Sequence, residues 1–584
     1  MKNLLFTILL ISVVTSCSKP EKKLNFDFTT TFEKTNGIET ATYEETINYY
    51  KNLADAYPEI SLIEMGKTDS GLPLHVVIFN SSREFDVEKI KNSSKNIILI
   101  NNGIHPGESD GIDATMMLLR DIAQDSEKIK ELENIILAVI PIYNVGGSLN
   151  RNSTSRTNQN GPAAYGFRGN ARNFDLNRDF IKADTKNAQS FAEIFHLLNP
   201  DIFIDNHVSN GADYQYAITH LFTQHNKLGN DLGAFLENTM RPSIEASLLE
   251  KNIPITPYVN VWGKTPEEGF SQFFDSPRYS SGYTTLFNTL GLMVETHMLK
   301  PYKQRVEQTY SFMESTIEFT LKNGAKIKEL RNYAVQQILE KNTYPISYEV
   351  DKTTFTTLQF KGYEGDYIDS KVTNGKRLFY DRDKPFSKPV KYYNQFKASK
   401  QITIPKAYIL KQGWWKILER LKDNSIEFTV FKKDTTITVE EQHITDYKTR
   451  TSAYEGHYPH YNTTITTSEK DIPFKKGDIY ISVNQSGARY IMETLEVEAT
   501  DSFFNWNFFD TILQQKEGYS GYVFEDIAEQ FLNENPALKD SLDLKIKTDK
   551  RFAANPRAQL DFVYKHSPHY EAAHLKLPVY KIYN

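Results

Sequence analysis

Asn96-Ile-Ile-Leu-Ile-Asn101 is an apolar run that leads directly into the short segment His105-Pro-Gly-Glu108. A second run, Asp201-Ile-Phe-Ile-Asp205, leads in the same way to His207. Short apolar runs bounded by polar residues are typical of buried strands. Because open α/β sheets bind their ligands at the carboxyl ends of such strands, we expect the polar residues after the two runs to converge.

Strand-like and helix-like segments alternate through the first half of the chain. Gly111–Ala123 and Lys186–Leu198 have the apolar spacing of helices, and the strand-like run Ile135–Tyr143 lies between them. Upstream, Thr42-Tyr-Glu-Glu45 fits a capping box that would begin another helix. This alternation predicts an α/β fold with a mixed, mostly parallel sheet and helices on both faces.

Length and composition indicate a globular protein of more than one domain. The chain has 584 residues, too many for one hydrophobic core, and its 39% hydrophobic and 13% aromatic residues are enough to form several. The net charge of -6 is small and dispersed, so nucleic-acid binding has no electrostatic support. We divide the chain into a signal peptide, a polar tether, an α/β domain and a β-rich mixed accessory region whose role the sequence does not define, over residues 1–16, 17–36, 37–330 and 331–584.

The amino terminus predicts a bacterial lipoprotein signal. The apolar run Leu4–Val14 is much shorter than the roughly 20 residues that span a bilayer. Cys17, the single cysteine, stands where such signals place their acylated cysteine; the alternative is an ordinary secretory signal with an incidental cysteine. We therefore expect a lipid anchor in the cell envelope, at the outer membrane or facing the periplasm. A lone cysteine also excludes internal disulfides and thiolate metal ligands.

His105, Glu108 and His207 form a candidate set of zinc ligands. Pro106-Gly107 opposes a helix, so a tight loop must present the first two. A histidine at a strand end is more often a hydrogen-bonded structural residue, and a His-x-x-Glu sequence alone is a weak signal. Because His207 and the His-x-x-Glu sequence both follow predicted buried strands, each is stronger evidence for metal binding than it is alone. Two histidines with one glutamate also leave the fourth zinc position open for water.

Glu295 interrupts another apolar run, Gly291-Leu-Met-Val-Glu-Thr-His-Met298. An acidic residue in such a run is rarely buried without a partner or a chemical role. A salt bridge to a nearby Arg or Lys is the structural alternative. His297 shares the face of Glu295 and is a rival metal ligand.

In their order along the chain these motifs resemble the zinc carboxypeptidase family, the carboxypeptidase A-like metallopeptidases. In that family a His-x-x-Glu loop and a distant histidine bind zinc, and a glutamate on a late strand is the general base. The resemblance assigns these roles to His105 with Glu108, His207 and Glu295. It covers roughly residues 40 to 320 and implies one zinc ion per chain.

The resemblance also gives roles to the Asn-, Gly- and Arg-rich stretch 144–184, a long loop of the kind that is usually functional. The family's Asp-x-Asn-Arg segment binds the substrate carboxylate, and an upstream arginine polarises the scissile carbonyl. Here these are Asp175-Leu-Asn177-Arg178 and Arg168. The family tyrosine that closes over the substrate has two candidate matches, Tyr279 and Tyr283. The resemblance implies a peptide substrate with a free C-terminus.

Three functions fit these residues to different degrees. A cell-envelope carboxypeptidase uses the whole set. A peptidoglycan stem-peptide amidase or a small-amide deacylase would need the same zinc core but a different pocket. A catalytically silent binding protein would have no need of Glu295.

In the accessory region His457-Tyr-Pro-His460 and His566 with His569 lack a nearby carboxylate or a strand end, so we expect no second metal site there.

Overall fold

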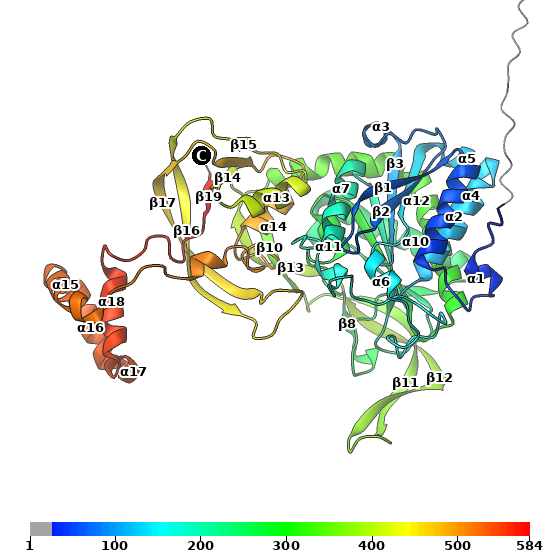
Figure 1. The fold of residues 1–584 in the computed structure, drawn as a ribbon. Helices are drawn as coiled ribbons and strands as arrows, with labels where there is room; N and C mark the ends of the chain where they lie inside the picture. The colour runs from blue at the N-terminus through cyan, green and yellow to red at the C-terminus, as the bar shows by residue number, and fades with distance from the viewer. Residues whose placement is uncertain (1–25, 584) are drawn as a thin grey trace, which may run out of the picture.

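An eight-stranded sheet in the order β1-β2-β4-β3-β5-β9-β6-β7 forms the centre of the amino-terminal half (Figure 1). In the computed structural model, β4, β3, β5 and β9 run parallel to one another, as do β6 and β7, whereas the β1–β2, β2–β4 and β6–β9 pairs are antiparallel. The mixed, mostly parallel sheet predicted from the sequence is confirmed. Its strands are Ile60–Lys67, Pro73–Asn80, Asn96–Asn102, Ile135–Ile140, Ile202–Ser209, Ile218–Phe222, Ile255–Pro257 and Leu290–His297, for β1 to β7 and β9 respectively.

Helices cover both faces of this sheet because its central strands are apolar on both sides. Ile97 and Leu99 face one hydrophobic core, which contains α7, whereas Ile98 and Ile100 face the other, which contains α2, α4 and α12. The principal helices are α2 Tyr43–Ala56, α4 Asp110–Ala123, α7 Lys186–Leu198, α10 Arg241–Glu250, α11 Ser280–Thr285 and α12 Tyr302–Leu339. Shorter ones are α3 Val87–Lys91, α5 Ser126–Glu131, α6 Val145–Leu149, α8 His225–Leu228 and α9 Asn230–Phe235.

The structure describes residues 26–583, so the predicted signal peptide and Cys17 lie outside the described residues. Residues 26–36 correct part of the predicted polar tether. They include α1, Thr31–Lys34, which begins with a capping box of Thr30 and Glu33. Phe32 is buried in the core that contains α2 and α4. Aromatic burial therefore attaches this segment to the domain.

The accessory region is β-rich, as predicted, but it begins later than residue 330, because α12 continues to Leu339. A six-stranded sheet, β15-β18-β14-β19-β16-β17, is its main element. Its strands are β14 Ala407–Leu410, β15 Thr429–Val430, β16 Thr435–Thr449, β17 His460–Phe474, β18 Ile479–Ser482 and β19 Val579–Ile582. The helices α13, Trp415–Asp423, and α14, Ala488–Leu495, pack with this sheet in the same hydrophobic core as α7 of the first domain.

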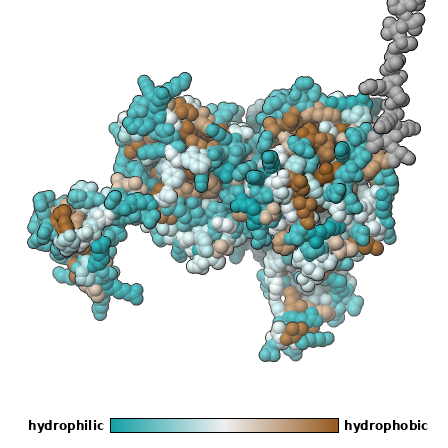
Figure 2. All heavy atoms as spheres, viewed as in Figure 1, coloured by the Kyte–Doolittle hydropathy of each residue, from teal (hydrophilic) through white to brown (hydrophobic). Residues whose placement is uncertain are grey.

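Two smaller parts project from this body, a β hairpin and a helical lobe. The hairpin is formed by β11, Thr356–Asp369, and β12, Lys376–Tyr393, and it pairs with β8, Phe270–Ser271. A separate two-stranded sheet is formed by β10, Thr343–Val350, and β13, Phe396–Thr403. A helical lobe was not predicted: α15 Gly521–Glu534, α16 Pro536–Thr548, α17 Lys550–Ala553 and α18 Pro556–His566 form a small core of their own. Figure 2 shows this lobe set apart from the body, with mostly hydrophilic residues on the visible face. Among the described residues, no helix has the length and apolar character needed to cross a membrane.

Candidate metal centre and active site

Three buried side chains meet at the carboxyl ends of β3 and β5. His105 and Glu108 lie in the loop between β3 and α4. His207 lies within β5, which extends to Ser209 instead of ending before the histidine as predicted. One ligand atom from each of the three residues lies within 4.8 Å of the others.

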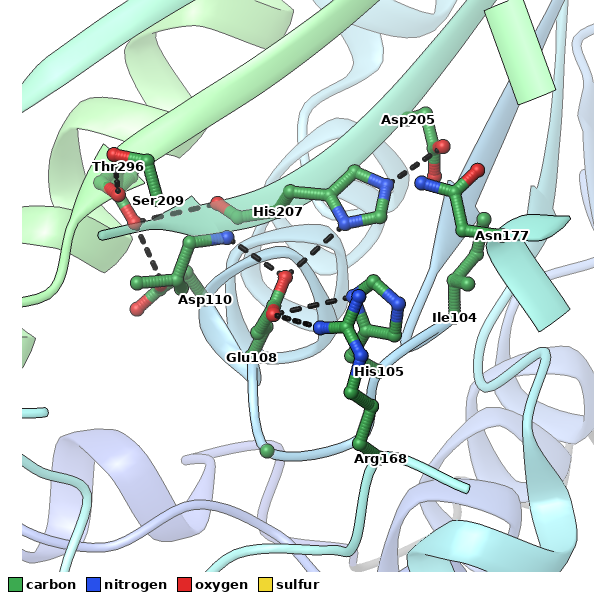
Figure 3. Close-up of polar contacts among 12 residues, drawn as sticks. Ile104, His105, Glu108, Asp110, Arg168, Asn177, Asp205, His207, Ser209 and Thr296 are labelled. Carbon is green, nitrogen blue, oxygen red and sulfur yellow. Dashed lines mark hydrogen bonds and ion pairs between the residues drawn. The ribbon is translucent and has the colours of Figure 1, made fainter. Parts of the chain in front are cut away.

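Each histidine presents one ring nitrogen to Glu108 and the other to a second carboxylate. The Nδ1 atoms of His105 and His207 are each 3.1 Å from a carboxylate oxygen of Glu108 (Figure 3). Their Nε2 atoms lie 2.9 Å from Asp175 Oδ1 and 2.8 Å from Asp205 Oδ2. Carboxylates on the far nitrogen are the usual support for metal-binding histidines, since they fix the ring and its tautomer.

The same three residues fit a zinc ion on chemical grounds. Although buried His105 Nδ1 lies 3.1 Å from Glu108 Oε1, it makes no hydrogen bond of acceptable geometry among the described residues. A buried polar atom without a partner is costly, and a cation beside it and Glu108 removes that cost. Two imidazoles and one carboxylate are also a known catalytic zinc set with one position open.

Glu295 lies on β9 directly opposite His207 on β5 in the parallel ladder. Its side chain is part of the wall of a pocket of about 550 Å³ that also contains His105, Glu108 and His207. Removal from water, opposed by His207 and supported by Glu108, raises the pKa of Glu295 to about 8. A divalent cation held by the neighbouring ligands would act in the opposite direction and favour the carboxylate.

The polar loop after β4 provides the next group. Asp175 Oδ1 accepts a hydrogen bond of 3.0 Å from the backbone N–H of Asn177, which begins the short 3₁₀ turn Leu176–Arg178. Leu176 is fully buried and holds this turn in the core, so the two polar residues after it face the pocket. Arg178 lies over the ring of Tyr279, 4.5 Å from its centroid. Asn177 Oδ1 accepts from the backbone N–H of Ser280 at 3.1 Å.

Arg168 also reaches the pocket from this loop. Its Nη2 is 2.8 Å from Asp175 Oδ2, and its Nη1 is 3.7 Å from Glu108 Oε1. Burial alone would lower the pKa of Arg168, but the charges of Asp175 and Glu108 outweigh burial and raise the pKa above its usual value. Burial alone would raise the pKa of Asp175, but the charges of His105 and Arg168 outweigh it and hold the pKa below its usual range. The arginine and the aspartate therefore form a fixed ion pair at the edge of the metal-ligand cluster.

The residues of two alternatives left open by the sequence occupy different positions in the structure. Tyr279 is in the wall of the pocket, whereas Tyr283 is fully buried in the core and its hydroxyl donates to Asn424 at 2.6 Å. His297 is buried away from the cluster. Its Nε2 is 2.9 Å from the carbonyl oxygen of Ala212, and its Nδ1 accepts from the backbone N–H of Leu299 at 3.2 Å. Neither Tyr283 nor His297 has an atom free to act in the pocket.

A family model described as zinc carboxypeptidase matches residues 46–201. The matched segment contains the His105–Glu108 loop and the stretch from Arg168 to Arg178, and the fold adds His207 and Glu295 to the same pocket. Residues 46–201 thus resemble the zinc carboxypeptidase family. Together with the buried His-Glu-His cluster and the carboxypeptidases to which the chain is similar, this match indicates a zinc-dependent metallocarboxypeptidase.

The comparisons also find carboxypeptidases among curated proteins and solved structures. Carboxypeptidase 2 of Trichophyton equinum is 23% identical over 469 residues, which cover 75% of this chain and 78% of the fungal protein. Carboxypeptidase A of Helicoverpa armigera is 14% identical, with a TM-score of 0.37 over 48% of this chain and 73% of that one. A metallo-carboxypeptidase from Pseudomonas aeruginosa, in complex with (2-guanidinoethylmercapto)succinic acid, is 12% identical, with a TM-score of 0.37 over 49% and 70%.

Several residues of this carboxypeptidase site were not singled out from the sequence. Asp205 lies two residues before His207 on the same strand, so strand periodicity places both on one face and was a usable signal. Asp175 was noticed only as the first residue of its motif, not as a partner of His105. Arg156 Nη1 is 2.9 Å from Glu108 Oε1, and no pattern in its loop indicated this contact.

Proposed function

We propose that this enzyme hydrolyses the C-terminal peptide bond of peptides or proteins, with zinc held by His105, Glu108 and His207. The observation that carries the proposal is the position of Arg178 and Asn177 in the same pocket as Glu295 and the three ligands. A guanidinium binds a carboxylate through two parallel hydrogen bonds. An arginine at this position therefore favours a substrate that ends within the pocket.

When bound at these three residues, zinc supplies a Lewis acid that lowers the pKa of water and polarises a carbonyl group. Residues of the chain would transfer the protons and stabilise the developing charge. Glu295 is placed to accept the proton of the attacking water and then to deliver it to the leaving amine. Arg168 lines the pocket, where its guanidinium can stabilise charge that develops on the carbonyl oxygen.

The remaining walls indicate what the pocket excludes and holds. Tyr279 is stacked on Arg178, so it limits the directions from which a carboxylate can approach the guanidinium. Part of the lining is apolar or aromatic, formed by Leu221, Tyr258, Phe273 and Met293. We infer that the side chain of the released residue lies against this surface.

Mass spectrometry of a mixed peptide library after incubation with the purified zinc enzyme tests the proposal. We expect products shortened by single residues from the C-terminus. A parallel incubation with peptidoglycan stem peptides tests the alternative substrate class. Internal cleavage of library peptides, or activity on stem peptides alone, would contradict the proposal.

We further propose that the enzyme acts in the cell envelope, anchored by lipid on Cys17 at the outer membrane or facing the periplasm. The support is the sequence around Cys17, where a short apolar run ends at the single cysteine. Labelling of producing cells with radioactive palmitate should mark the wild-type protein, and Cys17→Ser should remove the label. A labelled Cys17→Ser protein, or an unlabelled wild type, would contradict the anchor.

A further inference from the structure

The tip of a hairpin in the accessory region lies against the active-site loop. β16 and β17 are connected by residues 450–459, within which Tyr454 and His457 pair across a two-residue turn. Glu455 Oε2 accepts a hydrogen bond of 2.8 Å from the backbone N–H of Asp175, which is 280 residues away in the sequence. A Cβ atom on Gly456 would lie 3.0 Å from Cζ of Phe174, so the turn packs directly on the residue before Asp175.

The backbone of this turn makes the choice of glutamate unusual. Glu455 and Gly456 have φ angles of 49° and 77°. Two consecutive positive φ angles at the tip of a hairpin are typical of a type I′ turn, in which Asn or Gly is strongly favoured at the first position. Glutamate is strained there, and strain of this kind at a non-glycine residue points to a function of the side chain. The contact with Asp175 is the function that the structure offers.

Asp175 connects this contact to the metal-ligand cluster. Its Oδ1 holds His105 Nε2 at 2.9 Å, and its Oδ2 holds Arg168 Nη2 at 2.8 Å. Its backbone N–H is the group that Glu455 accepts from. A shift of this backbone would therefore move the support of one metal ligand and of one arginine together.

Two further contacts join the accessory region to the chain segments that contribute Arg178 and Tyr279 to the pocket. His457 Nε2 lies 2.6 Å from Asp184 Oδ2, near the end of the polar loop. Asp501 accepts from both the backbone N–H and the side chain of Arg278, at 3.1 and 2.8 Å. Arg278 immediately precedes Tyr279 and packs on the ring of Trp506, which is almost fully buried. The accessory region thus contacts both segments that present residues to a substrate carboxylate.

We propose that the accessory region is part of the carboxypeptidase active site, and that Glu455 is a positioning residue that acts through Asp175. The proposal rests on the proposed function for its catalytic readout. Glu455 fixes the backbone from which Asp175, Asn177 and Arg178 extend, so it sets both the carboxylate-binding geometry and the support of His105. Binding of a substrate with a free C-terminus is the property that depends most on it.

Glu455→Asn is the decisive variant because it separates the turn from the contact. Asn suits a positive φ better than Glu, so the turn and the melting temperature should be kept or improved. Its side chain is one methylene shorter and cannot reach the N–H of Asp175 without movement of the turn. Glu455→Gln keeps both the length and an acceptor oxygen. Glu469→Asn is the matched control, on an exposed position of β17 in the same hairpin.

Three measurements compare these variants in the full-length zinc enzyme. Amide hydrogen exchange of peptides spanning residues 170–180 should be faster in Glu455→Asn and unchanged in the other two. KM for a free-acid peptide should rise about 10-fold in Glu455→Asn, with a smaller change in kcat, because a hydrogen bond to a charged acceptor is lost. Zinc affinity, measured by competition with a chelator, should fall in the same variant.

Unchanged exchange and unchanged KM in Glu455→Asn would overturn the proposal. A raised KM without faster exchange would also overturn it, because Glu455 would then act on the substrate directly. If the wild type were inactive on peptides, the proposed function would fail separately, and the exchange and zinc measurements would still decide whether Glu455 positions the loop.

Discussion

His207 on β5 and Glu295 on β9 are directly paired in adjacent parallel strands. In a strand, successive side chains alternate between the two faces, so this pairing places the histidine and the glutamate on the same face. Val294, the preceding residue, is fully buried in the core on the other face. A slip of one residue would remove Glu295 from the pocket and bury its charge. The register of two strands thus places a proton acceptor beside a metal ligand.

Replacement of the proposed base should separate metal binding from turnover. We expect Glu295→Gln to keep zinc and to bind peptide, because the shape of the side chain is retained. The value of kcat should fall by about 10²–10⁴-fold, since the amide cannot accept the proton. Steady-state kinetics with zinc analysis of the same sample checks this. Glu250→Gln, at an exposed position at the end of α10, is the control. Near-normal turnover in Glu295→Gln would leave Glu295 a structural acid only.

Zinc affinity should fall by different amounts when a metal ligand, its supporting carboxylate or the unused histidine His297 is replaced. His207→Ala should lose zinc on dialysis, whereas His297→Ala should keep it, because both ring nitrogens of His297 are bonded elsewhere. Asp205→Asn should weaken zinc binding by about 10- to 100-fold, since it removes the carboxylate on His207 Nε2. Atomic emission after dialysis against a chelator series measures all three. Full zinc occupancy in His207→Ala would assign the third ligand elsewhere.

Sequence patterns were most reliable where one local rule decides the structure. The capping box at Thr42 and Glu45 forms as expected, and α7 has the predicted bounds Lys186 and Leu198. The strand predicted for Ile135–Tyr143 ends at Ile140 instead, because Pro141 follows and cannot donate a backbone hydrogen bond to the ladder.

Contacts between distant segments were not predictable in this way. The choice between Tyr279 and Tyr283 depends on which ring enters the core, and both follow the same polar stretch. The hydrogen bond from the backbone N–H of Asp175 to Glu455 joins two loops, and no pattern in either loop's sequence indicates that the two loops are in contact. Long-range packing decided these points, and local spacing carries no information about it.

Stability should fall in mild acid because of a partly buried histidine. His196 on α7 lies 3.1 Å from the hydroxyl of Tyr283 and packs on Phe287. Burial lowers the pKa of His196 from 6.5 to about 3, although a hydrogen bond with Asn424 opposes the effect. The unfolded chain therefore binds this proton below about pH 6.5 while the folded chain does not.

Because only the unfolded chain binds this proton, a fall in pH favours unfolding. Stability contributed by neutral His196 is complete above pH 6.5 and is lost as pH falls toward 3, by at most about 1.4 kcal/mol per pH unit. Thermal denaturation at a series of pH values between 7 and 4.5 should show a steeper loss in the wild type than in His196→Gln. Equal slopes would mean that His196 takes up its proton as readily in the folded enzyme as in the unfolded chain.

The carboxylate clamp is tested by pairing a protein change with a substrate change. Arg178 lies over Tyr279 in the pocket, and a bidentate contact with a carboxylate there is worth a few kcal/mol. Amidation of a good substrate's C-terminus should therefore lower kcat/KM by about 10²–10³-fold. Arg178→Ala should cause a similar loss on the free acid but little further loss on the amide, because both changes delete one interaction. Arg172→Ala, an exposed arginine of the same loop, should leave both values near wild type. Equal cleavage of free and amidated peptides by the wild type would mean that Arg178 does not bind the substrate carboxylate. The same zinc core would then belong to an endo-acting or small-amide hydrolase.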